Sequence, residues 1–318
     1  MTTSGSVAFN LNRDQIIRPA LRKLGAISAG EIPDNQTVQD CAMQLNALVK
    51  AWMAIGIHLW TESEAVLFVE IGQPVYTLGP GSGDHSTEIY TQTELDADAA
   101  LNATSIVVLS NTSVANGIDI GVTTDDGNIF WTTVASFSGT TITLTDALDD
   151  SASSGAAVYI ASPNIDRPLR IPGARRWDEI SNIETPLIPL SRQDYRNLPN
   201  KLQTGMVTQY FYDPRGGANV TGQLYLWPTP VNTTNNNIKF TYYRPLQTFD
   251  TAANTPDFPQ EWLDTLIWNL AKKMAPEYDC PPQRYQMVIQ EAAQSLDLVQ
   301  GWDREPESIY FGVNFDMR

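Results

Sequence analysis

The sequence contains very few of the residues on which most metal and nucleophilic sites depend. Its 318 residues include two cysteines, Cys41 and Cys280, and two histidines, His58 and His85. Two cysteines so far apart do not indicate a disulfide framework or a cysteine-rich zinc site, and they fit a reducing compartment. The scarcity of histidine excludes HExxH sites and metal centres built on several histidines. We therefore expect no metal and no cofactor.

Long hydrophobic runs are also missing. No stretch approaches the roughly 20 apolar residues of a membrane-spanning helix. The opening residues, MTTSGSVAFNLNRDQ, lack the basic start and apolar run of a secretory signal. We expect a protein that is not exported and has no membrane partner.

Basic residues are scarce, and in one window they are absent. The net charge of -16 comes from 36 acids and 20 bases, which argues against tight wrapping of nucleic acid because that requires clustered lysine and arginine. Residues 84–162 contain eleven acids and no lysine or arginine. The same window alternates at period two, is rich in Val, Ile and Thr, and has Asp-Gly and Ser-Gly turn signals. It predicts an inserted acidic β-module, a small barrel or sandwich.

Helical periodicity marks both ends of the chain. Apolar residues repeat at helical spacing from about Asn12 to Leu24, and again from a predicted capping box at Thr37 and Asp40 to Gly56. Two further long helices follow near the C-terminus, each with a proline suited to its first turn. These four helices predict a helical bundle.

The stretch EWLDTLIWNLAKKMAPEYD, residues 261–279, has more apolar width than one core needs. Trp262 and Leu266 share one stripe, whereas Trp268 lies well around the helix from both. We expect one face to hold the subunit together, with Trp52 as a further packing residue, and another face to meet a neighbouring subunit or the second long helix. Complete burial of Trp268 within its own subunit would contradict this expectation.

Strand patterns fill the middle of the chain. AVLFVEIGQPVYTLG, residues 65–79, alternates like a hairpin, and segments after the insertion predict an antiparallel β domain with a short helix capped by Ser191. The predicted fold is α+β: a helical bundle, made of the N-terminal helix pair and two long C-terminal helices, with an antiparallel β domain and an inserted small all-β barrel or sandwich. We divide the chain into a core, the insertion and an extended C-terminal tail: 1–83 with 163–303, 84–162, and 304–318.

Carboxylate pairs are the remaining enzymatic possibility, because two acids roughly 5 to 9.5 Å apart suffice for glycoside hydrolysis. Glu62, Glu64, Asp178 and Glu179 are the first candidates, although a solvated, salt-bridged surface is the favoured interpretation. The glycine-rich segment GPGSGDHS, residues 79–86, lacks the lysine of a phosphate loop and predicts a flexible loop.

Two further polar groups have both a functional and a structural interpretation. RPLRIPGARR carries the one basic concentration, which could contact DNA phosphate or an acidic partner, or could pair with the chain's own acids; its members are Arg167, Arg170, Arg175 and Arg176. The acid doublets Asp125-Asp126 and Asp149-Asp150 lie at predicted turns and match no EF-hand loop, so a turn role is favoured over calcium binding.

Several segments, in a fixed order, resemble a known family. They are QIIRPALRKLGAISAGE, LNALVKAWMAIGIHLWT, GQPVYTLG, IPLSRQDYRNLPNK, GQLYLWPTP, YYRPLQTF and DFPQEWLDTLIWNLAKKMAPEYD. The series is similar to the head-to-tail adaptor proteins of short-tailed bacteriophages, also called tail accessory or packaged-DNA stabilisation proteins. It covers most of 12–83 and 165–280. The window 84–162 resembles a β-module that some members have and shorter members lack.

The resemblance implies a non-enzymatic virion protein at the head–tail junction, made in the bacterial host cytoplasm. Such proteins form a homo-oligomeric ring, usually a dodecamer, beneath the portal protein. The ring extends the DNA channel, holds the packaged genome, and presents surfaces to the tail nozzle or tube and to fibres, here through 84–162. Double-stranded DNA passes without sequence-specific binding. The tail would contact the portal, with these residues as candidates: Ile309, Tyr310, Phe311, Phe315 and Arg318.

Two alternative functions remain at this point. One is a virion-associated peptidoglycan hydrolase, built on the carboxylates named above. The other is a fibre- or glycan-binding tail protein in which the β-module at 84–162 is the binding part.

Overall fold

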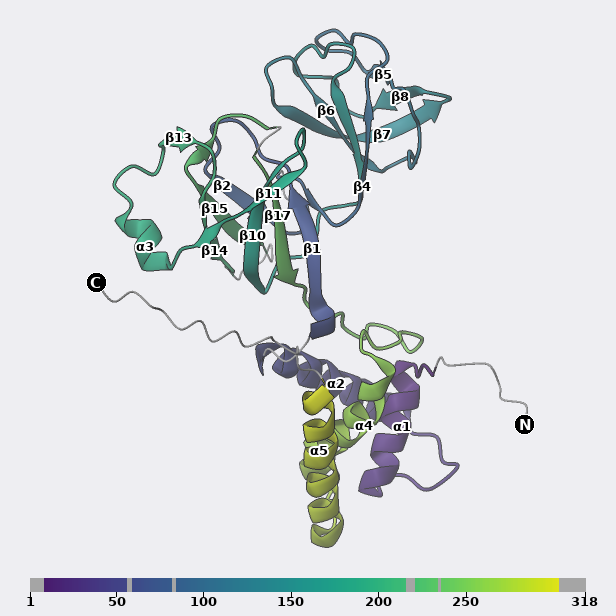
Figure 1. The fold of residues 1–318 in the computed structure, drawn as a ribbon. Coiled ribbons are helices and arrows are strands. Elements are labelled where there is room, and N and C mark those ends of the chain that lie inside the picture. The colour runs from purple at the N-terminus through teal and green to yellow at the C-terminus, as the bar shows by residue number, and fades with distance from the viewer. Residues whose placement is uncertain (1–8, 56–58, 82–83, 216–220, 234–235, 303–318) are drawn as a thin grey trace, which may run out of the picture. The chain divides into compact units, whose positions relative to one another are not determined.

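The computed structural model describes residues 9–55, 59–81, 84–215, 221–233 and 236–302 (Figure 1). The chain forms two compact units. The helical unit combines Met1–Thr61 with Leu246–Arg318, and the β unit is Glu62–Pro245. The fold is mixed α+β, as the sequence predicts. Among the described helices, none has the length and hydrophobicity of a membrane span.

The described residues of the helical unit form four α-helices and three short 3₁₀ turns. They are α1 (Arg13–Leu24), α2 (Asn35–Ile55), η1 (Leu59–Thr61), η2 (Gln260–Trp262), α4 (Leu263–Met274), η3 (Ala275–Glu277) and α5 (Pro282–Trp302). The predicted start and end of α1 are confirmed, because Asn12 forms a capping box with Gln15 and Gly25 ends the helix at φ 81°.

The predicted start of α2 is wrong. The helix begins at Asn35, and the Asp34 carboxylate accepts a 2.9 Å hydrogen bond from the backbone N–H of Thr37. Thr37 is therefore the third residue of the helix and not its cap. Aspartate is as good an N-cap as threonine, so the choice between them depends on where the preceding chain turns. The predicted C-cap, Gly56, lies outside the described residues.

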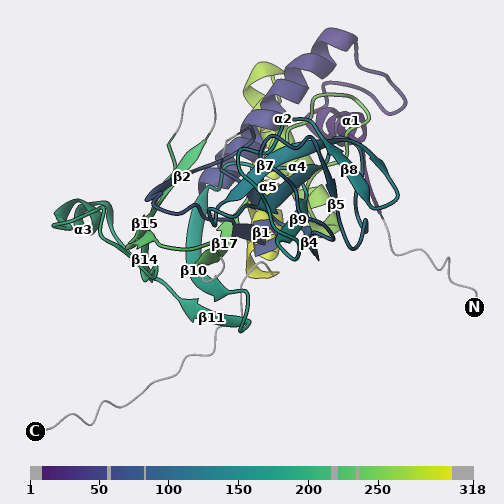
Figure 2. The same ribbon diagram turned by 90° about the horizontal axis from the view of Figure 1, so that it is seen from above.

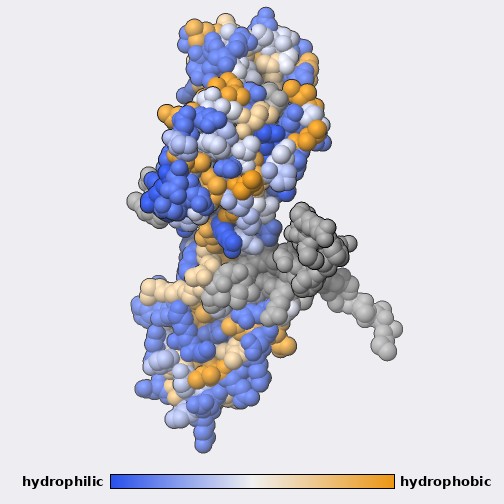
Figure 3. Space-filling model, turned by 60° about the vertical axis from the view of Figure 1, so that its left-hand side comes forward, coloured by the Kyte–Doolittle hydropathy of each residue, from blue (hydrophilic) through white to orange (hydrophobic). Residues whose placement is uncertain are grey.

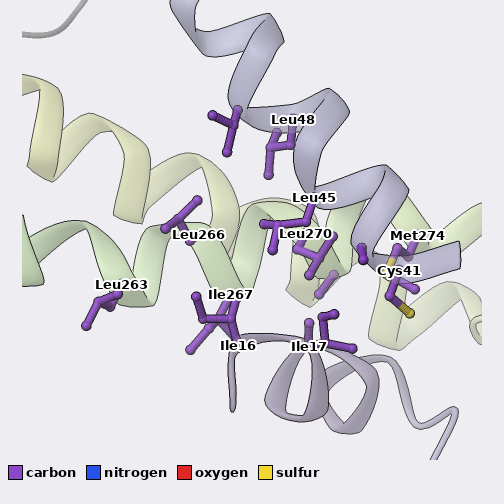
Figure 4. Close-up of a cluster of buried hydrophobic side chains, with 14 of the residues drawn as sticks. Ile16, Ile17, Cys41, Leu45, Leu48, Leu263, Leu266, Ile267, Leu270 and Met274 are labelled. Atoms are coloured by element: carbon purple, nitrogen blue, oxygen red, sulfur yellow. The ribbon is translucent and has the colours of Figure 1, made fainter. Parts of the chain in front are cut away.

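One hydrophobic core joins α1, α2, α4 and α5 (Figure 4). Side chains from three of these helices point into the same space, among them Ile16, Leu45, Leu266 and Leu270, which are fully buried. Burial of this size is the main stabilising term of the unit, since each such side chain contributes roughly 1.5–3 kcal/mol.

A buried polar contact fixes α4 against α5. The side-chain amide of Asn269 donates to the carbonyl oxygens of Thr265, at 3.0 Å, and of Ala292, at 3.2 Å. The Thr265 hydroxyl donates to the carbonyl of Ser295 at 3.1 Å. Both side chains are buried, so the bonds satisfy groups that would otherwise be costly to bury, and they set the register between the helices.

Two sheets and a small strand pair form the part of the β unit outside the insertion. The five-stranded sheet has the order β11 (Ile183–Pro186), β10 (Arg170–Asp178), β17 (Asn237–Tyr243), β1 (Glu62–Leu67) and β3 (Ser86–Thr87). The four-stranded sheet has the order β12 (Ile188–Pro189), β14 (Gln209–Asp213), β15 (Gly222–Trp227) and β2 (Val75–Leu78). The pair is β13 (Thr204–Gly205) with β16 (Thr229–Pro230), and α3 (Arg192–Asn197) is capped by Ser191 as predicted.

The two larger sheets share one core. Alternate residues of β1, β2, β15 and β17 are buried, including Leu67, Tyr76, Leu224 and Phe240. Figure 2 shows β10, β17 and β1 as neighbours, in agreement with their antiparallel pairing. The predicted hairpin within residues 65–79 is wrong, because β1 pairs with β17 and β3 whereas β2 pairs with β15 in the other sheet.

The insertion forms its own six-stranded sheet. The order is β4 (Tyr90–Glu94), β9 (Ala157–Ala161), β6 (Asp119–Thr123), β7 (Ile129–Ser138), β8 (Thr141–Leu144) and β5 (Ser105–Val107). Hydrogen bonds also link the ends of its first and last strands: Asp96 donates to Val107 at 2.8 Å, and Leu109 donates to Glu94 at 2.9 Å. The insertion has a hydrophobic core of its own, which includes Ile120, Val134 and Ile142.

Aromatic side chains pack the insertion against the five-stranded sheet. Phe68, just after β1, lies 5.1 Å from Trp131 of β7 and 4.7 Å from Tyr159 of β9, measured between ring centroids. The His85 ring stacks on Trp131 at 3.6 Å and 13°, and only 5% of His85 is exposed. The expected flexible loop is therefore wrong at His85, because the stacking surface comes from a strand 46 residues away along the chain.

The Asn269 contact gives a stability prediction. We expect Asn269→Ala to lower the free energy of unfolding by about 2 kcal/mol, because two buried hydrogen bonds and their packing are lost. Chemical denaturation of the full chain measures this change. Gln294→Ala, on the exposed side of α5, is the matched control and should stay within about 0.5 kcal/mol of wild type. Equal stability of the Asn269 variant and wild type would contradict the assignment.

The burial of His85 between the insertion and the five-stranded sheet predicts a loss of stability in acid. Burial lowers the pKa of His85 to about 4, below its ordinary 6.5. Because the folded state favours the neutral imidazole, the stability that His85 contributes is fully present above pH 6.5. It is lost as the pH falls from 6.5 towards 4. The loss between pH 7 and pH 5 is about 2 kcal/mol.

His85→Phe keeps an aromatic ring over Trp131 but cannot be protonated. We expect this variant to lose about 2 kcal/mol less stability than wild type between pH 7 and pH 5. Denaturant unfolding of both proteins at the two pH values provides the comparison. The contributions of all other titrating groups are the same in both proteins and cancel in the difference. Parallel pH dependence of the two proteins would count against a neutral, buried His85.

Candidate functional site

The predicted portal-contact residues lie outside the described residues. Ile309, Tyr310, Phe311, Phe315 and Arg318 all belong to 303–318. Their role therefore stays a prediction.

Three of the four predicted packing residues are buried within the helical unit. Trp52, Trp262 and Leu266 belong to its core. The Trp262 ring lies 5.5 Å from Trp52 and 4.9 Å from Trp60, and Phe258 completes this aromatic group at 5.9 Å from Trp262. Such tilted and edge-on contacts add to the burial of large apolar surfaces. These residues stabilise the unit in which they lie.

Trp268 is only partly buried. One side packs on the core, and the Lys23 ammonium lies 3.2 Å from the centroid of its ring. Lys23 also lies 3.9 Å from the Asp264 carboxylate, and burial lowers the pKa of Lys23. Trp268 thus packs partly on the core and partly under a long cationic side chain, and it is not completely buried.

Arg175 pairs with acids of its own chain. Its guanidinium contacts the Glu64 carboxylate and lies 2.9 Å from Glu184. Lys239 lies 2.8 Å from Glu184 and 4.1 Å from the centroid of the Trp177 ring. The hydrogen bond from Lys239 holds the pKa of Glu184 below its ordinary value. These groups form a charge network across neighbouring strands.

The other three predicted arginines differ from one another. Arg167 donates to the carbonyls of Pro214 and Arg215 at 3.4 and 3.3 Å. Arg176 donates to the carbonyl of Val207 at 3.3 Å. Arg170 is exposed. The structure does not bring the four guanidiniums together on one contact surface, and Arg170 is the member of this set that an external anion could reach most easily.

The carboxylates proposed for hydrolysis have separate environments. Glu62 is exposed, and Glu64 is paired with Arg175. Asp178 accepts from the backbone N–H groups of Ile180 and Ser181, and hydrogen bonding from Ser181 lowers its pKa. Glu179 accepts from the Tyr159 hydroxyl at 2.7 Å, and burial raises its pKa. Asp178 therefore holds a turn, and Glu179 helps to seat the insertion.

Of the first doublet, Asp126 accepts hydrogen bonds within its own turn, whereas Asp125 accepts them from residues 26 and 28 positions further along the chain. Asp125 accepts from Ser151 and Ser153, and Asp126 accepts from Thr124 and Asn128. Within the described part of the chain, no cluster of three or more His, Cys, Asp or Glu side chains is arranged to hold a metal ion.

A surface that the sequence interpretation missed lies on the outer side of the four-stranded sheet. We call it the basic aromatic face and define it by Arg192, Tyr195, Phe211, Asp213, Arg215 and Tyr225. Phe211 and Tyr225 are register partners on β14 and β15, and their rings stack at 5.4 Å. Tyr195 of α3 lies against both, at 5.7 and 4.8 Å.

One buried carboxylate holds two arginines at this face. Asp213 accepts from Arg192 at 2.6 Å and lies 3.3 Å from the Arg215 guanidinium. The side chains of both arginines remain 54% exposed, whereas that of Asp213 is 10% exposed. Each guanidinium has five N–H donors, so donors remain free for an external partner. Sequence spacing did not reveal the face, because its residues come from α3, from β14 and the segment after it, and from β15.

Hydrophobic side chains are distributed over the rest of the visible surface. On the face shown in Figure 3, they form small patches separated by hydrophilic residues. Scattered patches of this kind are normal for a protein surface, so they identify no contact site by themselves.

Comparisons with curated proteins and with solved structures identify no family for this chain. No curated protein matches the chain. Among solved structures, the chain is similar to part of the Gp54 tailspike of Acinetobacter baumannii bacteriophage AP22, solved in complex with A. baumannii capsular saccharide. The identity is 23%, the TM-score is 0.22, and the match covers 25% of this chain and 16% of the tailspike.

A family model described as SU10 adaptor protein matches residues 132–309, which is more than half of the chain. The match contains α3, α4, α5 and all strands from β8 onward. It confirms the resemblance inferred from the ordered sequence segments. The chain belongs to the SU10 adaptor protein family, a family of phage structural proteins.

Proposed function

We propose that this protein is a phage head-to-tail adaptor that forms a ring, a dodecamer, beneath the portal protein. The ring extends the DNA channel, stabilises the packaged genome until ejection, and gives the tail nozzle and fibres a docking platform. The family match over residues 132–309 is the observation that carries the proposal. In this proposal the helical unit is a bundle, the insertion at 84–162 is a β-barrel, and residues 304–318 are an extension that contacts the portal.

The exposed side of α5 supports a subunit contact. The inner side of this helix packs through Val288, Ala292 and Val299. Met287 and Leu298 are 49% and 77% exposed. Eleven residues make three helical turns, so these two side chains share one stripe. A ring in which each subunit presents two different faces can cover this stripe with a neighbour.

The charge distribution supports passage of DNA without tight binding. Binding of DNA gains free energy when clustered cations release counterions. The described arginines of the RPLRIPGARR segment are instead mostly engaged within the chain. Arg170 is the candidate for a transient phosphate contact.

The proposal predicts that the tail strengthens portal binding. Removal of residues 305–318 should weaken association with the portal protein without unfolding the subunit, because the tail carries aromatic anchors of the kind that concentrate binding energy. Native electrophoresis with purified portal measures the association, and thermal unfolding verifies the fold. Tyr310→Ala with Phe311→Ala and Phe315→Ala should reproduce most of the effect. Undiminished portal binding by the truncated protein would refute the role of the tail.

A second prediction concerns the stripe on α5. Met287→Glu with Leu298→Glu should reduce ring formation on the portal at least tenfold, because two charges would be desolvated at a subunit contact. Native mass spectrometry with and without portal gives the assembly state. Gln286→Glu with Gln290→Glu is the control, since both glutamines are exposed on the same helix and the charge change is equal. Normal rings from the Met287 and Leu298 variant would remove this stripe from the interface.

A further inference from the structure

Two segments of the β unit carry net charges of opposite sign. Residues 84–162 carry eleven acids and no bases, and residues 190–215 carry four bases and two acids. The four bases are Arg192, Arg196, Lys201 and Arg215. The second segment contains α3 and β14, which supply most of the basic aromatic face.

The basic aromatic face is built in advance and not only basic in composition. Asp213 fixes Arg192 and Arg215, and Arg192 lies 5.7 Å from the centroid of the Phe211 ring. Lys201 lies 5.8 Å from the Tyr195 ring. Fixed guanidiniums lose little conformational entropy when they bind a carboxylate, and partly exposed aromatic rings beside them offer apolar area.

The insertion has a surface with the complementary chemistry. We call it the acidic edge and define it by Glu94, Asp96, Asp98, Leu101 and Leu109, all of which are exposed. The backbone of Leu109 donates to Glu94. The neighbouring pair, Leu95 with Val108, bridges the two segments and is buried. Side chains alternate between faces along such segments, so Glu94 and Leu109 point outward together.

We propose that the acidic edge of one copy binds the basic aromatic face of a second copy. The insertion of the same copy is held on the other sheet, through Phe68, His85 and the bond from Tyr159 to Glu179. Its acidic edge is therefore not the partner of its own basic aromatic face. The contact joins two different surfaces, so it can repeat from subunit to subunit.

The mixed character of both surfaces favours a protein partner over DNA. A DNA backbone would engage the arginines but would leave the partly exposed rings of Phe211 and Tyr225 without a new apolar contact. The acidic edge supplies carboxylates for the guanidiniums and leucines for the rings. The long-range repulsion between DNA and a chain of net charge -16 also disfavours DNA as the partner.

Two full-length variants separate the surfaces. Arg192→Gln with Arg196→Glu removes positive charge from the face and from the exposed α3 position beside it, and leaves the acidic edge intact. Glu94→Lys with Asp96→Lys reverses the edge and leaves the face intact. The glutamine at 192 can still donate to Asp213. Among the described residues, none forms a hydrogen bond to the side chains of Glu94 and Asp96, so both variants should fold. Thermal unfolding of each verifies this.

Sedimentation velocity then tests the contact. We expect wild type to self-associate, each variant alone to remain a monomer, and an equimolar mixture to form a dimer through its one intact pair of surfaces. The association constant of the mixture should fall at least tenfold between about 0.05 M and 1 M salt, because the Debye length shortens and screens the charges. Arg18→Gln with Arg22→Glu, on exposed positions of α1, changes the net charge by the same amount as the Arg192 and Arg196 variant and should behave as wild type.

The inference is wrong if the mixture does not dimerise, if either variant alone self-associates as wild type does, or if the α1 control also loses association. It is also wrong if the face variant loses binding to a 30-base-pair duplex while copies fail to pair. The inference extends the proposed ring, yet its failure is distinguishable. Wild-type rings on the portal without a mixed dimer would refute only this contact, and a mixed dimer without portal rings would refute only the adaptor function.

Discussion

The antiparallel pairing of β1 with β17 is the constraint on which the organisation of this protein depends. It places Glu62 opposite Tyr243, so the chain enters and leaves the β unit at neighbouring points. The segments before Glu62 and after Pro245 can therefore fold into one helical core, although most of the chain lies between them. The pairing also places Phe68, at the far end of β1, where the insertion is seated.

Local signals predicted the helices well, and this success has a physical basis. The apolar repeat of α1, the Asn12 cap and the left-handed Gly25 act within a few residues of one another. The same holds for Ser191 at the start of α3. Strands were recognised but their partners were not, because alternation indicates an extended segment and says nothing about its neighbour. β1 and β2 look like a hairpin in sequence, yet each satisfies its backbone groups in a different sheet.

The candidate site was harder to predict, because its charges act across long separations in sequence. Arg175 belongs to a basic segment, but Glu184 on the adjacent strand β11 and Glu64 on β1, one strand beyond β17, pair with its guanidinium. The opposite error occurred at Arg192 and Arg215. No motif or basic run in the sequence marks these two arginines. In the structure, Asp213 contacts both of them on the face where Phe211 and Tyr225 are register partners. His85 likewise appeared to belong to a loop until Trp131 supplied its stacking surface.

The position of the acids resolves an apparent conflict between charge and assembly. A net charge of -16 on every copy would oppose close packing of subunits if it were spread evenly. Eleven of the 36 acids lie instead in the window 84–162, and the remaining chain carries 25 acids against 20 bases. Outside this window the β unit carries ten bases against nine acids, whereas the helical unit carries ten bases against sixteen acids. The carboxylates of the sheets can therefore pair locally, as Glu184 does with Arg175 and Lys239. Most of the repulsion is therefore concentrated on the insertion, where positive charge on another surface can offset it.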